Sequence, residues 1–158
     1  MTDEPVDEGG RSTGPHQLEM PGWISCAPFE ELLAMTIVEA ANGEAVLTMP
    51  FYRQFAQGAG LLHGGALVSL ADTAVVMAIK SIVPPKSHFA TISLQTRFLY
   101  PVKQGVVTAK AKVLKSEDRL LHGEATVLND EGRPVLEFAS VFKLARRTQV
   151  EGVSFADQ

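Results

Sequence analysis

The chain has 158 residues, of which 46% are hydrophobic and 20% are charged, and its formal net charge is −4. This length suits one domain, and the apolar content is high enough to bury a core, which argues against a disordered chain. The negative charge argues against nucleic-acid binding, because phosphate contacts need an excess of clustered Lys and Arg.

The first part of the chain, residues 1–20, is expected to form a flexible tail. It is acidic and polar and has no basic segment followed by an apolar stretch, so no secretory signal is expected. Cys26 is the only cysteine, which favours a reducing, cytoplasmic location and leaves no disulfide within one chain. We predict a single domain over 21–145 and a C-terminal tail over 146–158.

A short helix and a hairpin are expected next. The segment 26–35 has Pro28 near its first turn, where a missing N–H is harmless, and is predicted to be helical. The segment 36–50 contains two strand-like runs around Asn42-Gly43, a pair typical of hairpin turns. The Gly-rich segment 51–62 is predicted to be a loop.

One long helix is predicted over 63–82, because Ala, Leu and Met support it and Pro84-Pro85 follow it. The segment is apolar on nearly all sides, which indicates a helix enclosed by other elements. Its length is close to the roughly 20 residues of a membrane span, but Asp72 lies at its centre, so we predict no membrane association.

The second half of the chain predicts antiparallel strands joined by short, turn-rich links. Apolar and polar residues alternate with a period of two, which indicates one buried and one solvated face in the segments 91–100, 105–115, 119–128 and 134–144. In the first of these, the expected buried face carries Ile92, Leu94, Phe98 and Tyr100. We therefore predict an α+β fold in which about six antiparallel strands wrap around one long central helix.

Asp72 is a lone carboxylate in the predicted helix. None of its neighbours one turn away is basic, since these are Val68, Ser69, Val75 and Val76. Burying an unpaired carboxylate is costly and raises its pKa. Two interpretations stay open: a structural carboxylate bonded to backbone or hydroxyl groups, or a general base or nucleophile.

The pair Gly64-Gly65 opens the same helix. Free N–H groups at a helix N-terminus bind a developing oxyanion, and glycine permits close approach of a ligand. Alternatively, the glycines only permit a tight turn. His63 either caps the helix or bonds to the loop at Gln57, and we favour an orienting role for it over that of a base, which Asp72 already fills.

Asp72 lies seven positions after Gly65, which corresponds to about 10 Å along a helix. A reacting carbonyl must lie within about 3 Å of both its oxyanion donors and its attacker. One helix therefore cannot readily supply both groups to one carbonyl, whereas two antiparallel copies can. If both residues are catalytic, the sequence predicts two sites per dimer, each between subunits.

The stretches "HGGALVSLADTA" and "ATISLQTRFLYPVKQG" resemble the hotdog-fold acyl-CoA thioesterases of the phenylacetate-pathway and acyl-CoA thioesterase 13 type, over roughly residues 30–144. The resemblance implies a dimer with one continuous sheet, usually a homotetramer of two dimers. It also implies hydrolysis of acyl-CoA thioesters with neither a metal nor an organic cofactor.

The resemblance also assigns expected roles to individual residues. It implies that Gly65 or Gly64 binds the oxyanion, that Asp72 is the catalytic carboxylate, and that Thr91 helps to hold the water, where several relatives have serine. Many relatives carry asparagine at the position of Gln57, so this departure bears on substrate preference.

Several basic and apolar residues are candidates for contacts with the substrate. The candidates for contacts with the phosphates of CoA are Arg97, Lys103, Lys110, Lys112, Lys115, Arg119, Arg146 and Arg147. For any one of them, the simpler interpretation is a basic residue on an ordinary solvated strand face. The residues predicted to lie near the acyl end of the substrate are Val76, Met77 and Phe89. Two alternatives to a thioesterase are a non-catalytic acyl-CoA-binding regulatory module and, less well matched, a dehydratase of 3-hydroxyacyl thioesters.

Overall fold

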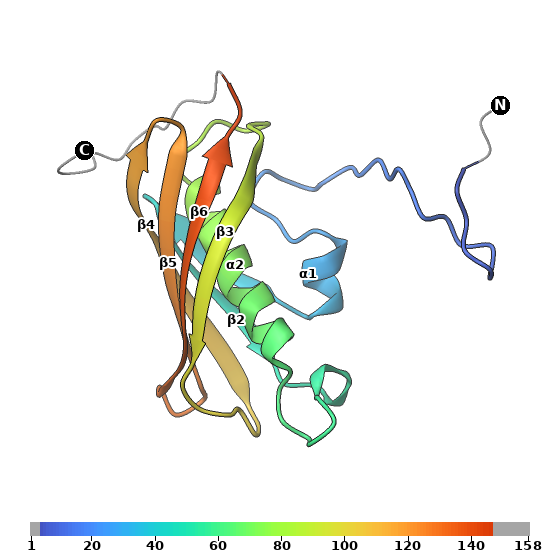
Figure 1. Ribbon diagram of the computed structural model, residues 1–158, viewed down its shortest axis with the longest axis vertical. Helices are drawn as coiled ribbons and strands as arrows, with labels where there is room; N and C mark the ends of the chain where they lie inside the picture. Colours follow the sequence, from blue (N-terminus) through green and yellow to red (C-terminus); the bar gives the residue numbers. More distant parts are fainter. Residues whose placement is uncertain (1–3, 147–158) are drawn as a thin grey trace.

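A computed structural model describes residues 4–146 and confirms the predicted α+β architecture. Six antiparallel strands form one sheet in the order β1-β2-β4-β5-β6-β3, which curls around the long helix α2 (Figure 1). The elements are α1 (Pro28–Leu32), β1 (Thr36–Ala41), β2 (Glu44–Pro50), the 3-10 helix η1 (Arg53–Phe55), α2 (Gly64–Lys80), β3 (Phe89–Phe98), β4 (Val106–Glu117), β5 (Leu120–Leu128) and β6 (Pro134–Leu144).

The predicted hairpin and long helix are both present. Asn42 and Gly43 form the β1–β2 turn with positive φ angles of 54° and 80°, the conformation for which this pair is suited. The helix α2 begins at Gly64, with His63 as its N-cap, and ends at Lys80, slightly inside the predicted limits. No helix within residues 4–146 is both long enough and apolar enough to cross a membrane.

The core lies between α2 and the concave face of the sheet. Fully buried residues of α2 include Leu70, Ala74 and Val75. The strand β5 approaches the helix very closely at Gly123, where an added Cβ would lie 2.4 Å from Cγ1 of Val75. This contact requires glycine and brings the helix close against the sheet.

The edge strand β3 departs from the sequence prediction. Leu94 and Phe98 stand opposite the buried Ser140 and Leu136 of β6, so they lie on the helix side of the sheet. Nevertheless, they are 46% and 54% exposed, and Ile92, at a register shift, is 56% exposed. The predicted burial of this apolar face is wrong for the single chain, because neither α2 nor another strand covers this edge.

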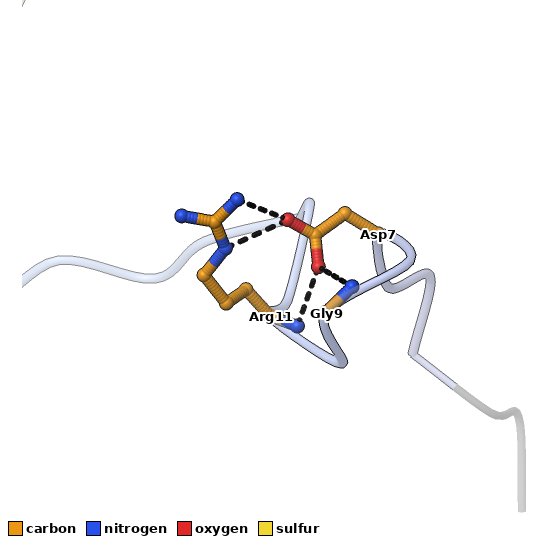
Figure 2. Close-up of polar contacts among 3 residues, drawn as sticks. All are labelled: Asp7, Gly9 and Arg11. Atoms are coloured by element: carbon orange, nitrogen blue, oxygen red, sulfur yellow. Dashed lines mark hydrogen bonds and ion pairs between the residues drawn. The ribbon is translucent and has the colours of Figure 1, made fainter.

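The N-terminal segment lies away from the sheet and reaches the body of the protein only as it approaches α1 (Figure 1). Within it, Asp7 Oδ1 accepts hydrogen bonds from the N–H groups of Gly9 and Arg11, and Asp7 Oδ2 pairs with the Arg11 guanidinium at 2.7 Å (Figure 2). These hydrogen bonds from Arg11 lower the pKa of Asp7. Of the predicted C-terminal tail, residues 147–158 lie outside the described residues.

Candidate active site

Asp72 lies half-buried in the middle of α2 and bonds to the neighbouring edge strand. Thr91 Oγ1 of β3 donates to Asp72 Oδ1 at 3.1 Å, with Oδ2 at 3.4 Å. Within residues 4–146 no Lys, Arg or His forms an ion pair with this carboxylate. Burial raises the pKa of Asp72, while the hydrogen bond from Thr91 opposes part of that shift. A carboxylate with this environment accepts a proton more readily than an exposed one.

The N-terminus of α2 is capped by His63. Its backbone is extended, with φ −61° and ψ 131°, and its Nδ1 accepts the N–H of Gly65 at 2.8 Å. Because Nδ1 is an acceptor in this bond, the neutral ring carries its proton on Nε2. The capping interpretation of His63 is thus the one that the structure shows, and its side chain does not bond to Gln57.

Gly64 is the first residue of α2 and lines a hollow of about 330 Å³. Within the described part of the chain, no acceptor contacts its N–H. An added Cβ here would lie 3.0 Å from Cε1 of Phe98. The hollow is lined mainly by apolar groups, namely those of Leu61, Leu62, Leu67, Phe98, Leu99 and Val102.

Gln57 lies at the border between this hollow and a larger one of about 820 Å³. Its Oε1 accepts the N–H of Ala59, and its backbone N–H bonds to the carbonyl of Leu61 at 2.8 Å. The amide therefore supports the loop that precedes α2. Its predicted influence on substrate preference is not tested by these contacts.

The larger hollow is lined by two basic residues that form no ion pair with any described residue. Arg53 and Lys103 line it, no carboxylate is among its lining residues, and neither cation forms an ion pair with another described residue. By contrast, three of the predicted phosphate contacts pair with glutamates at 3.3–3.6 Å, namely Arg97, Lys112 and Lys115. Arg147 lies outside the described residues.

Arg53 was missed by the sequence analysis. Its only sequence cue is its place in the Gly-rich loop shortly before Gly64-Gly65. That loop and the link between β3 and β4 are about fifty residues apart in the chain, and only the fold places Arg53 and Lys103 on one hollow.

A third hollow, of about 370 Å³, begins beside Thr91. This hollow is lined by two of the three residues predicted for the acyl end, Val76 and Phe89. Met77, the third residue predicted for the acyl end, does not line this hollow: it is 1% exposed and belongs to the core, because one step along a helix turns the side chain by about 100°.

The predicted site residues thus form two groups within one chain. Thr91 joins Asp72, whereas His63 and Gln57 lie with the glycines at the start of α2. Since Gly65 and Asp72 belong to one unbroken helix, about 10 Å of helix axis separates them. A single chain does not bring the two groups around one carbonyl. No cluster of three His, Cys, Asp or Glu side chains with metal-binding geometry occurs among residues 4–146.

Comparison with known proteins gives the family. The sequence profile of the Thioesterase superfamily matches residues 59–136, which include the glycines, Asp72 and Thr91. The chain is 33% identical over 86 residues to a 1,4-dihydroxy-2-naphthoyl-CoA hydrolase of Listeria monocytogenes, covering 54% of this chain and 69% of that protein. It is 38% identical over 79 residues to a protein of Pasteurella multocida provisionally named an esterase, covering 49% of this chain and 57% of that protein.

Solved structures show the same fold. One is a variant of the phenylacetic acid degradation protein PaaI from Thermus thermophilus, with a TM-score of 0.68 and 25% sequence identity over 74% of this chain and 98% of that one. The predicted hotdog fold is therefore confirmed. The chain spans little more than half the length of some curated relatives, 57% and 58% in two of them.

Proposed function

This chain belongs to the thioesterase superfamily, and we propose that it hydrolyses acyl-CoA thioesters to a free acid and CoA. The observation that carries the proposal is the pair formed by Asp72 and Thr91, a half-buried carboxylate of raised pKa held by a hydroxyl within the matched region. The name of the Listeria relative supports a CoA thioester as the class of substrate.

In the proposed reaction, Asp72 takes a proton from water while the water oxygen attacks the thioester carbonyl. The hydroxyl of Thr91 helps to place this water. The tetrahedral intermediate then collapses, the C–S bond breaks, and the CoA thiolate leaves and takes up the proton that Asp72 received from water. In the alternative route, the Asp72 carboxylate attacks the carbonyl directly, the C–S bond breaks, and the CoA thiolate leaves. Water then hydrolyses the resulting mixed anhydride to the free acid and restores the carboxylate. The proposal involves neither a metal ion nor an organic cofactor.

The carbonyl oxygen is proposed to bind at the N-terminus of α2. The Gly64 N–H is available without any rearrangement, whereas the Gly65 N–H must first exchange His63 Nδ1 for the substrate oxygen. Removing one such donor typically lowers the rate by about 100- to 1,000-fold. An orienting role for His63 follows, because its ring controls whether the Gly65 N–H is free.

The active unit is proposed to be a homodimer, with a homotetramer as the expected assembly. The exposed apolar side chains on β3, together with the unpaired edge of that strand, support pairing with a second copy. In an antiparallel dimer, Asp72 of one chain faces the Gly64 end of the partner helix, and each dimer holds two sites.

The nucleotide end of CoA is proposed to lie in the hollow that Arg53 and Lys103 line. This hollow adjoins the one at Gly64 through Gln57, so a ligand bound by the helix N-terminus reaches the two cations next. Charged phosphate oxygens are suited to such unpaired cations.

The test is thiol release from a panel of short, long and aromatic acyl-CoA thioesters, with Asp72→Asn as the matched variant. We expect release by the unaltered protein and a large loss in the variant. Binding of acyl-CoA without any release would favour a regulatory module and overturn the proposal. Oxygen-18 incorporation into the Asp72 carboxylate in a single turnover would identify direct attack.

A further inference from the structure

We propose that Trp23 forms the end wall of the acyl pocket and limits the length of the acyl group. The inference rests on the proposed function for the identity of the ligand. It concerns a residue outside the matched region 59–136, and it starts from the third hollow, whose lining residues are Trp23, Val76, Lys80, Ser87, His88, Phe89, Ala90, Thr91 and Phe142.

The hollow follows one stripe of α2 away from the reacting group. Asp72, Val76 and Lys80 are spaced four residues apart, so they lie above one another on the same face of the helix. Thr91, which bonds to Asp72, lines the near end, and Trp23 lines the hollow together with Lys80. About 12 Å of helix axis separates Asp72 from Lys80. An acyl group that reacts at Asp72 therefore extends toward the indole of Trp23.

Trp23 is fixed in place by three contacts with one residue. Its Nε1–H donates to the carbonyl of Lys80 at 2.9 Å, and Lys80 Nζ donates to the carbonyl of Trp23 at 3.1 Å. The same ammonium lies 4.7 Å from the centroid of the indole ring. Such reciprocal contacts hold a large side chain rigidly, which is what a wall of fixed position requires.

The chemistry of the lining indicates what the pocket accepts. Val76, Phe89 and Phe142 give it apolar sides, and the rings of Phe89 and Phe142 contact each other in a tilted arrangement, with 5.9 Å between their centroids and 60° between their planes. Apolar acyl groups that end before the indole fit this space, whereas long fatty acyl chains meet the ring. Hydrophobic pockets discriminate by size in this way, since each additional methylene that fits or clashes changes binding measurably.

The experiment uses the intrinsic fluorescence of Trp23, the only tryptophan of the chain. Non-hydrolysable thioether analogues of acyl-CoA with increasing straight-chain length are titrated into the full-length protein. We expect no change in emission with the acetyl analogue and a change once the chain is long enough to reach the indole. Equal responses to all lengths, or none at any length, would overturn the proposal.

Variants of Trp23 then distinguish a role as the end wall of the acyl pocket from a general role in the stability of the fold. In Trp23→Ala, we expect longer analogues to bind about 10-fold more tightly by calorimetry, while binding of the acetyl analogue is unchanged. Trp23→Phe keeps a ring and should keep most of the length limit. Leu18→Ala, which truncates an exposed apolar residue of the same segment, should leave the profile unaltered. An unchanged length profile in Trp23→Ala contradicts the inference.

These binding readouts do not depend on turnover. If the unaltered protein releases no thiol from any acyl-CoA, the proposed hydrolysis fails, whereas a length-dependent emission change still supports the end wall. If hydrolysis occurs but its length profile is the same in Trp23→Ala, only the end wall fails.

Discussion

Thr91 of the edge strand β3 donates a hydrogen bond of 3.1 Å to Asp72 in the middle of α2, although nineteen positions separate the two residues. Within residues 4–146 it is the only donor found in contact with this carboxylate. The bond stabilises the ionised form against the effect of burial, which raises the pKa. Asp72 is thus kept ionisable within a largely apolar helix.

Asp72→Asn should lower kcat by about 100- to 10,000-fold with little change in KM, because the amide cannot accept the proton of water but keeps a similar shape. Steady-state thiol release from the best acyl-CoA of the panel measures both constants. Thr91→Ser, which retains the hydroxyl, serves as the control and should remain active. Activity of Asp72→Asn close to that of the unaltered protein would exclude Asp72 from the chemistry.

The pH dependence of kcat/KM should show an acidic limb governed by Asp72. The base works only when ionised, so kcat/KM falls as the pH drops through its raised pKa, at a higher pH than for an exposed aspartate. Thr91→Val removes the bond that lowers this pKa and should move the limb to still higher pH. A limb that stays in place in Thr91→Val would show that another group titrates.

The same carboxylate should make folding less favourable at neutral pH. Because the pKa of Asp72 is higher in the folded than in the unfolded chain, the folded state binds more protons between the two values. The free energy of unfolding therefore falls as the pH rises through this window and stays lower above it. We expect Asp72→Asn to unfold at higher denaturant concentration than the unaltered protein at pH 7, and at a similar concentration below both pKa values.

Gly64→Pro tests the free N–H at the start of α2. Proline suits the first helical position, and the extended backbone of His63 is compatible with a following proline, so the helix should persist while this donor is lost. We expect about a 100-fold loss in kcat. Gly64→Ala introduces a Cβ near the same Phe98 but keeps the N–H, and it should lose much less. Equal losses in both variants would point to crowding by the Phe98 ring.

A mixture of two impaired variants tests whether the site lies between subunits. Refolding Asp72→Asn together with Gly64→Pro yields mixed dimers in which one of the two sites has both an intact Asp72 and an intact Gly64. We expect activity in the mixture to rise well above that of either variant refolded alone, since each variant by itself keeps only its small residual activity. Failure to recover activity in verified mixed dimers would argue for a site within one chain.

Charge reversal at Arg53 or Lys103 should weaken binding of the nucleotide end of CoA. An exposed ion pair contributes up to about 1 kcal/mol, so we expect KM to rise about 2- to 5-fold in Arg53→Glu and in Lys103→Glu, with a weaker effect at high salt. A pantetheine thioester, which lacks the nucleotide, should be unaffected. Lys143→Glu, an exposed cation outside this hollow, is the control. Equal effects on both substrates would exclude a phosphate contact.

Sequence reasoning predicted those features that depend on residues close together in the chain. Asn42-Gly43 marks its own turn, His63 caps the helix that follows it, and the composition of 64–80 favours a helix. Asp72 is recognisable as an unpaired carboxylate because no basic residue lies one helical turn away. Each of these depends on backbone preferences or on neighbours within about four positions, so the order of the residues is enough to determine it.

The tertiary structure decided which distant residues meet. The strand β3 pairs with β6 rather than with β4, its neighbour in sequence, and this leaves its apolar face uncovered and places Thr91 beside Asp72. The indole N–H of Trp23 bonds to the carbonyl of Lys80, 57 positions away in the chain. Arg53 and Lys103 line the same hollow. Such contacts depend on strand order and on how the sheet curves around α2, and the periodicity of the sequence encodes only which face of each element is apolar.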